Sequence, residues 1–278
     1  MTEIADQIEK IERIQPLNPV MLDLLGAIQN PHSQASDLEK IINTDANTSA
    51  TILKIANSPF YGMSGRINSV KDACVLLGVN QLKNIIYATA IDQATNKGPH
   101  KQWILQMRIH TTACALIASV IALQPGVDID KGQAYSLGLL HQLGKQVVLS
   151  ELPELFEDLI QNDMSDSEKQ ASMSEAFSQA GLIIAKKWRL PSVFSDCVVG
   201  LRQPFDHSAS HANEIKLVQC AHKLAQALGF ISTGEELQLD VKEVIAQHYT
   251  DLDAEHVLNS ITEAISNHPD LASATQGS

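Results

Sequence analysis

Apolar residues recur along this chain at the three- and four-residue spacing of amphipathic helices, and no stretch shows the sustained alternation of a strand. Between residues 79 and 94, for example, Leu82, Ile85, Ile86 and Ala90 fall on one helical face. The same pattern predicts further helices over residues 100–123, 131–150, 168–188, 211–228, 235–248 and 254–266. The sequence therefore predicts an all-α fold.

Polar residues and glycine mark several helix ends in the N-terminal half. Asp45 is placed to cap the start of a helix that ends at Asn57, because its carboxylate can accept a hydrogen bond from a free backbone amide. Ser69 has the same position before the next helix, and Gly78 stands where a C-terminal cap is expected. These signals predict two short helices ahead of the longer one at 79–94.

The clearest turn-rich stretch is Thr-Asn-Lys-Gly-Pro at residues 95–99. We place a boundary there between two helical subdomains, residues 1–97 and 98–209. Residues 210–278 are expected to form acidic C-terminal helices that pack on the second subdomain.

The composition agrees with a helical globular protein. Hydrophobic residues make up 44% of the 278 residues and charged residues 19%, which is outside the range of disordered chains. Aromatic residues make up only 4%, whereas strands favour aromatic and β-branched side chains. A chain of this length buries enough apolar surface to fold without a disulfide or a structural metal.

The formal net charge of -12 is concentrated near the C-terminus. Residues 230–278 contain nine acidic residues and a single lysine, Lys242, and so carry -8 of that charge. A field of this sign repels phosphate backbones, so we expect no nucleic-acid partner.

The cysteines and the N-terminus indicate a cytoplasmic protein. Cys74, Cys114, Cys197 and Cys220 each lie in an apolar run without a Cys-x-x-Cys pair, which is typical of buried thiols in a reducing compartment. The N-terminus is polar and acidic, unlike a signal peptide. The longest apolar stretch, residues 113–123, is too short to span a bilayer, so no membrane association is expected.

Three histidines stand within apolar helical runs: His110, His141 and His222. A buried imidazole needs a hydrogen-bond partner or a metal ion, because an unsatisfied polar ring is costly in an apolar interior. Each histidine alone is best interpreted as a hydrogen-bonded core residue. Their sequence context carries the further information.

Residues 138–145 read Gly-Leu-Leu-His-Gln-Leu-Gly-Lys, which resembles the Gly-Leu-Leu-His-Asp-Ile-Gly-Lys signature of HD-domain phosphohydrolases. In those enzymes the His-Asp pair, an earlier His and a later Asp hold a divalent metal that activates water. The resemblance matches His110 to the earlier His and His141 to the His of the His-Asp pair. Gln142 and His222 stand where the two Asp ligands are expected. A neutral amide is a weak ligand, so the resemblance implies a disabled hydrolase site.

A second resemblance covers residues 14–209 and is more specific. The runs Leu-Lys-Ile-Ala-Asn-Ser-Pro-Phe-Tyr-Gly at 53–62 and Ile-Asn-Ser-Val-Lys-Asp-Ala at 67–73 are similar to those of the HDOD domain, an HD-related output domain of bacterial signalling proteins. This family implies an all-helical fold, no established catalysis and action through other proteins. The motif residues that could contact a partner are Asp45, Asn57, Ser58, Phe60, Tyr61 and Gly62; each also has a use in a turn or in packing, which we favour.

The chain departs from its HD-like relatives at further positions. Phe177 stands where some relatives carry a histidine, before the Gly181-to-Trp188 segment, and Arg202-Gln203-Pro204 replaces a later histidine cluster. We call His110, His141, Gln142, Lys145 and His222 the relic pocket.

We therefore predict a non-catalytic signal-transduction module without catalytic residues or a cofactor, whose partners are other signalling proteins. Zinc or nickel held by His110, His141 and His222 is an open alternative, because neutral imidazoles bind both ions. Two other functions stay open. One is a metal-dependent phosphohydrolase of a nucleotide or cyclic dinucleotide with an altered ligand set. The other is a nucleotide-binding sensor that uses Lys145 and Arg108 without turnover.

Overall fold

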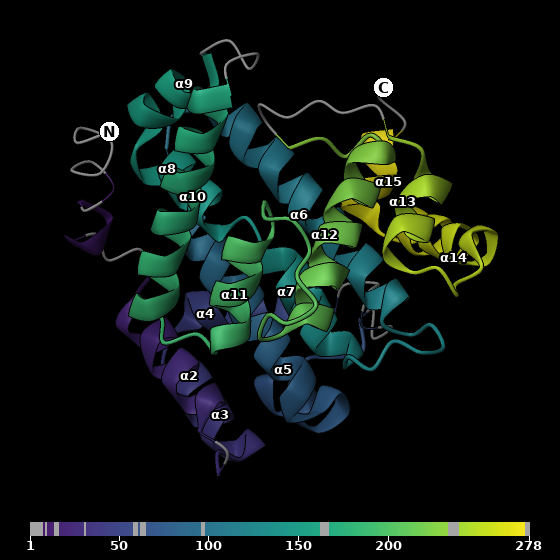
Figure 1. The fold of residues 1–278 in the computed structure, drawn as a ribbon. Coiled ribbons are helices and arrows are strands. Elements are labelled where there is room, and N and C mark those ends of the chain that lie inside the picture. The colour runs from purple at the N-terminus through teal and green to yellow at the C-terminus, as the bar shows by residue number, and fades with distance from the viewer. Residues whose placement is uncertain are drawn as a thin grey trace.

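A computed structural model of the chain describes residues 8, 10–13, 17–30, 32–57, 61, 65–95, 98–161, 167–232 and 239–275. Helices account for all the regular structure in these residues, and no strand occurs among them, which confirms the predicted all-α class (Figure 1). We describe the helices in the order of the predicted division, as an N-terminal subdomain, a second subdomain and a C-terminal group.

The predicted N-terminal subdomain contains the 3-10 helix η1 (Lys10–Arg13) and the helices α2 (Pro19–Gln29), α3 (Ala35–Ile42), α4 (Ala46–Ala56) and α5 (Val70–Thr95). η1 itself packs against α10 (Ser167–Lys187), which belongs to the second predicted subdomain. The predicted caps are present: the Asp45 side chain accepts from the Thr48 amide at 2.8 Å, and the Asp72 amide donates to Ser69 Oγ at 3.0 Å. The predicted break is also present, because Gly78 has a φ of 74° inside α5. α5 is thus two helical segments joined at Gly78.

The second predicted subdomain, which we call the HD-like subdomain after the signature at residues 138–145, contains α6 (Lys101–Ile121), α7 (Lys131–Leu140), α8 (Leu143–Glu151), α9 (Pro153–Gln161), α10 (Ser167–Lys187) and α11 (Ser192–Gly200). α6 packs along α7, and α8 packs against α10. α5 contacts both α7 and α8 and so joins the two subdomains. The prediction of one helix over 131–150 was wrong, because the helix breaks at His141 and Gln142, which cap α7 and α8.

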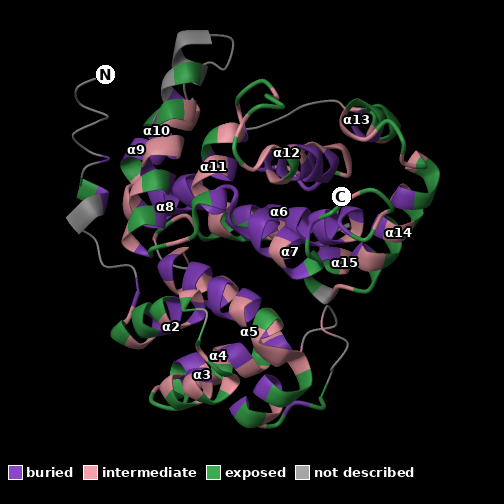
Figure 2. Cartoon of the chain, turned by 60° about the horizontal axis from the view of Figure 1, so that its bottom comes forward, coloured by how far each residue is buried: buried purple, intermediate pink, exposed green. Residues whose placement is uncertain are grey.

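The C-terminal group contains α12 (Ala212–Ala227), α13 (Val241–His248), α14 (Ala254–Ser266) and α15 (Pro269–Thr275). α12 lies on α6 and α7, while α14 and α15 contact α6. Figure 2 shows the buried α6 and α7 in the middle, between α5 on one side and α12 on the other. The sequence pattern missed α15, which is held by the fully buried Leu271.

Two helices, Val70–Thr95 and Lys101–Ile121, are long and apolar enough to cross a membrane when length and composition alone are considered. In the fold, 50% and 67% of their apolar stretches are buried, and the first helix is broken at Gly78. A buried core helix of a globular domain has these same properties, so we assign both helices to the core.

Two glycines allow helices to approach closely around the relic pocket. A Cβ atom at Gly138 would lie 2.6 Å from the Cα atom of Ala115 and 2.7 Å from the backbone oxygen of Cys114, so α7 meets the backbone of α6 there. A Cβ atom at Gly144 would overlap the backbone oxygen of Phe177 on α10. Any larger residue at either position would force the helices apart.

Gly138→Ala is expected to destabilise the folded protein by about 1–3 kcal/mol, because backbone atoms of α6 cannot yield to the new methyl group. The matched control is Gly26→Ala on the exposed face of α2, where no atom lies within 4 Å of the added carbon. That control should be stabilising by up to about 1 kcal/mol. Urea denaturation followed by circular dichroism measures both, and equal effects of the two substitutions would contradict the close approach.

Candidate functional site

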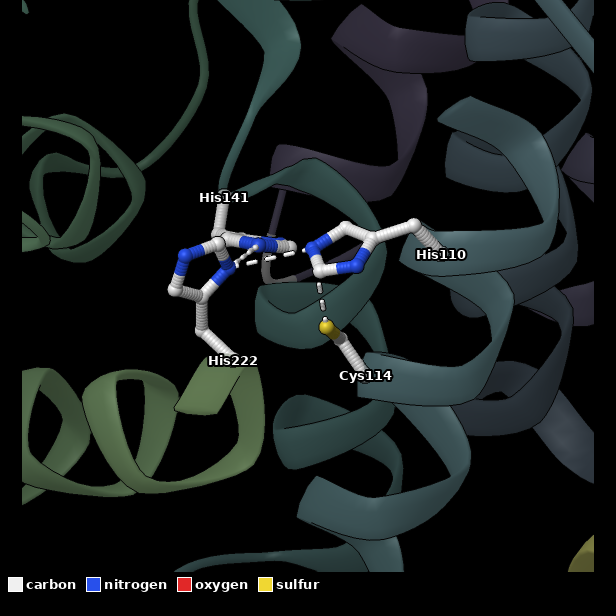
Figure 3. Close-up of side chains that lie close together, drawn as sticks. All are labelled: His110, Cys114, His141 and His222. Carbon is white, nitrogen blue, oxygen red and sulfur yellow. Dashed lines mark hydrogen bonds between the residues drawn. The ribbon is translucent and has the colours of Figure 1, made fainter. Parts of the chain in front are cut away.

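Three imidazole rings from different helical segments point toward one another (Figure 3). His110 comes from α6, His141 follows the last residue of α7, and His222 comes from α12. His222 Nδ1 lies 3.0 Å from His110 Nε2 and 3.1 Å from His141 Nε2. The structure thus brings together three of the five residues of the relic pocket through segments that are far apart in the sequence.

Backbone carbonyl groups determine how two of these rings are protonated. His110 Nδ1 lies 2.6 Å from the backbone oxygen of Phe230, and His141 Nδ1 lies 2.6 Å from that of Gly138. A carbonyl oxygen only accepts hydrogen bonds, so each Nδ1 carries the hydrogen. In the neutral rings, Nε2 of both histidines therefore presents a lone pair toward His222.

Cys114 is the fourth member of this cluster. It lies one helical turn after His110 on α6, and its Sγ atom is 3.4 Å from His110 Nε2. The nearest donor atoms of the four residues all lie within 4.8 Å of one another. We predicted Cys114 only as a buried apolar residue; it is buried, but the four-residue spacing from His110 is a signal that the sequence interpretation did not use. We call His110, Cys114, His141 and His222 the His–Cys cluster.

The other two residues of the relic pocket belong to a separate polar group. Lys145 is only 1% exposed, and its Nζ atom donates to Ser232 Oγ at 2.7 Å. Ser232 Oγ in turn donates to Gln142 Oε1 at 2.9 Å. Lys145 is therefore a buried residue of this Lys–Ser–Gln chain and does not lie on the helix surface. Ser232, which follows α12, was not predicted.

Arg108 lies apart from Lys145. It lines a cleft of about 420 Å³ between the N-terminal helices and α6–α8, and Lys145 is not among the lining residues. Arg108 Nη1 is 4.0 Å from Asp92 Oδ1 on α5. The cleft that Arg108 lines therefore does not include Lys145, which the nucleotide-sensor alternative pairs with it.

Position 177, where some relatives carry a histidine, has an apolar side chain here. Phe177 on α10 is buried, with its ring centroid 5.9 Å from that of Phe156. The Nζ atom of Lys145 and the guanidinium carbon of Arg202 each lie 5.9 Å from the Phe177 centroid. The Phe177 ring thus lies near two cationic side chains in this region.

The family-motif residues that the structure describes have structural uses. Asn57 caps α4 and bridges to the following loop: its Nδ2 donates to the Ile67 oxygen at 2.7 Å, and its Oδ1 accepts from the Ile67 amide at 3.1 Å. Hydrogen bonds from Thr48 lower the pKa of Asp45 below its usual value. Burial raises the pKa of Tyr61 well above its usual value. Ser58, Phe60 and Gly62 lie outside the described residues.

The fold and the cluster define a class: an all-α domain with a central group of three histidines and a cysteine that, among the described residues, includes no carboxylate. Residues 14–204 match the model of the HDOD domain, so the chain belongs to the HDOD family. This confirms the resemblance drawn from the motifs.

The chain is also similar to solved structures and to a curated relative. An HDOD domain protein of unknown function from Geobacter sulfurreducens superposes with a TM-score of 0.72 at 19% identity, covering 96% of this chain and 97% of that one. A candidate phosphohydrolase from Shewanella amazonensis gives 0.73 at 17%, covering 95% of both chains. An uncharacterized protein of Treponema pallidum is 27% identical over 77% of this chain, which spans 41% of that protein's length.

Ser232→Ala is expected to destabilise the protein by about 1–3 kcal/mol, because it removes the hydroxyl that connects the Lys145 ammonium group to the Gln142 carbonyl. Ser260→Ala on α14 is the matched control, since its hydroxyl only bonds the backbone of its own helix near the surface. The control should stay within about 0.5 kcal/mol of the wild type. Both values come from denaturant unfolding curves; an unchanged midpoint in Ser232→Ala would show that the hydroxyl link has no energetic role.

Proposed function

We propose that the protein is a non-catalytic module of bacterial signal transduction that acts in the cytoplasm through contacts with other proteins. The observation that carries the proposal is the donor set of the His–Cys cluster. Among the described residues, it combines three imidazoles and one thiol with no carboxylate. Membership of the HDOD family supports the same role.

The donor set argues against hydrolysis of a phosphate ester. A metal-dependent hydrolase needs an open metal position for water, and a group that accepts a proton as that water attacks. In this chain four side-chain donors lie within 4.8 Å of one another, so a metal held by all four in tetrahedral geometry would have no open position for water. The Gln142 amide cannot accept a proton as a carboxylate does, and its oxygen is bonded to Ser232.

The alternative is a metal-dependent phosphohydrolase with an altered ligand set. The name of the Shewanella amazonensis structure points in that direction, but its identity of 17% to this chain carries the fold and not the activity. An active enzyme of this kind would have to use a nitrogen or sulfur ligand set and a base other than residue 142.

We expect no turnover of cyclic dinucleotides or nucleoside phosphodiesters above background when the protein is assayed with zinc, nickel, manganese or magnesium. The readout is chromatographic separation of substrate and product. His141→Ala and the exposed-site variant His256→Ala serve as a pair. Turnover that persists in His256→Ala and disappears in His141→Ala would overturn the non-catalytic proposal.

A surface suited to protein contact lies on the first segment of α5. Val75 is 72% exposed and Leu76 48% exposed, directly before the break at Gly78. Exposed apolar side chains such as these are surface that a protein partner can cover. This segment follows the family-motif residues in the sequence, which supports a recognition role for the N-terminal subdomain.

A double substitution, Val75→Glu with Leu76→Glu, should abolish capture of a specific partner from native lysate without changing thermal stability by more than a few degrees. Leu123→Glu is the control, because Leu123 is 63% exposed in the turn after α6, and it should retain the partner. Quantitative mass spectrometry of the captured proteins measures both. Equal recovery from all three proteins would exclude this segment as the contact surface.

A further inference from the structure

We propose that His110, Cys114, His141 and His222 form a four-ligand structural site for one zinc ion. This inference goes beyond the proposed regulatory function and does not depend on it. It also differs from the expectation that the protein has no cofactor, and it adds Cys114 to the three histidines considered from the sequence.

The first argument is the convergence of lone pairs. Nε2 of His110 and Nε2 of His141 both present lone pairs to His222 Nδ1, because their own Nδ1 hydrogens are directed to the Phe230 and Gly138 oxygens. The Cys114 thiol also lies beside His110 Nε2, so the donor atoms of all four residues face one another. A cation at the centre would accept electron density from all three nitrogens at once.

The second argument is size. Zinc–nitrogen bonds of about 2.0–2.1 Å and zinc–sulfur bonds of about 2.3 Å place tetrahedral ligand atoms roughly 3.3–3.7 Å apart. The nitrogen–nitrogen distances of 3.0 and 3.1 Å and the sulfur–nitrogen distance of 3.4 Å are within a few tenths of an ångström of these values. The widest separation is at most 4.8 Å, which a small side-chain rotation would close.

The third argument is the outer shell. In zinc sites the histidine nitrogen that does not bind the metal donates to a carbonyl or carboxylate, which fixes the ring and its tautomer. The backbone oxygens of Phe230 and Gly138 already hold two rings in this way, each at 2.6 Å. Two ligands are therefore oriented before any ion binds.

The donor chemistry selects the ion. Three neutral imidazoles and a thiolate suit zinc and its neighbours among the transition metals, whereas magnesium, calcium and manganese prefer oxygen ligands. The Cys114 thiol releases its proton on binding, and the thiolate then offsets one of the two positive charges of the ion. A closed set of four protein ligands is typical of structural zinc sites.

The position of the site defines its effect. Its ligands come from α6, from the junction of α7 and α8, and from α12, so one ion would link the C-terminal helices to the HD-like subdomain. Ion binding should therefore stabilise the whole chain, and a chelator should reverse this stabilisation.

The test uses the full-length protein, stripped with a chelator and titrated with zinc or cobalt(II). We expect one ion per chain and a raised midpoint of thermal unfolding. We also expect, with cobalt, the sulfur-to-metal charge-transfer absorption and intense visible bands of a four-coordinate thiolate site. Magnesium should produce none of these changes.

Variants assign the ligands. Cys114→Ser preserves the size of the side chain and should lose the charge-transfer band. It should also weaken zinc binding at least about tenfold, because substitutions of residues that only orient the ligands already have an effect of this size. His222→Ala should lose stoichiometric binding. Cys197→Ala, a buried thiol outside the cluster, should bind as the wild type does.

Should Cys114→Ser fail to fold, Cys114→Ala offers a second test, and binding by the folded wild type stays decisive. No stoichiometric zinc binding by the wild type would overturn the site, and a charge-transfer band retained in the folded Cys114 variants would remove Cys114 from it. Zinc binding without turnover leaves the regulatory proposal intact, whereas turnover contradicts that proposal whatever the ligands are.

Discussion

The backbone contact between α6 and α7 at Gly138 is the constraint on which the centre of the molecule depends. Without a side chain at this position, α7 approaches the backbone of Ala115 and Cys114. The carbonyl of the same glycine accepts the hydrogen bond that orients His141. One residue thus sets the spacing of the two helices and the direction of a ring in the cluster, and His110 and Cys114 face that ring from α6.

The centre of the molecule also depends on the C-terminal group, which lies beyond the residues that match the family model. The match ends at residue 204, yet His222 supplies the third ring, Phe230 orients His110, and Ser232 bonds both Lys145 and Gln142. The buried polar interior is therefore completed by a segment outside the HDOD match. Because the remaining buried groups need these partners, the C-terminal group and the HD-like subdomain are expected to fold together.

Local signals in the sequence were sufficient for much of the fold. Apolar periodicity located most helices, and the caps at Asp45 and Ser69 and the break at Gly78 follow from the chemistry of single residues. The break at His141 could not be predicted in this way, since its neighbours continue a helical apolar pattern. It becomes favourable because distant groups bond the residues around it: His222 contacts His141, and Ser232 contacts Gln142. The same dependence on distant partners hid the place of Cys114 in the cluster and the burial of Lys145.

The relic pocket has no carboxylate at positions 142 and 222, but its side chains are still polar. A glutamine at position 142 brings no negative charge, so the nearby Lys145 ammonium is stabilised by dipoles such as the Ser232 hydroxyl, in a chain that ends on the Gln142 oxygen. A buried cation in the adjoining cluster would then need a negative charge from another residue. Cys114 is the one acidic group in the cluster that can provide it, because its thiol can ionise whereas the three imidazoles are neutral or cationic. On the proposed assignment, a donor set of nitrogen and sulfur atoms suits a closed site that connects helices.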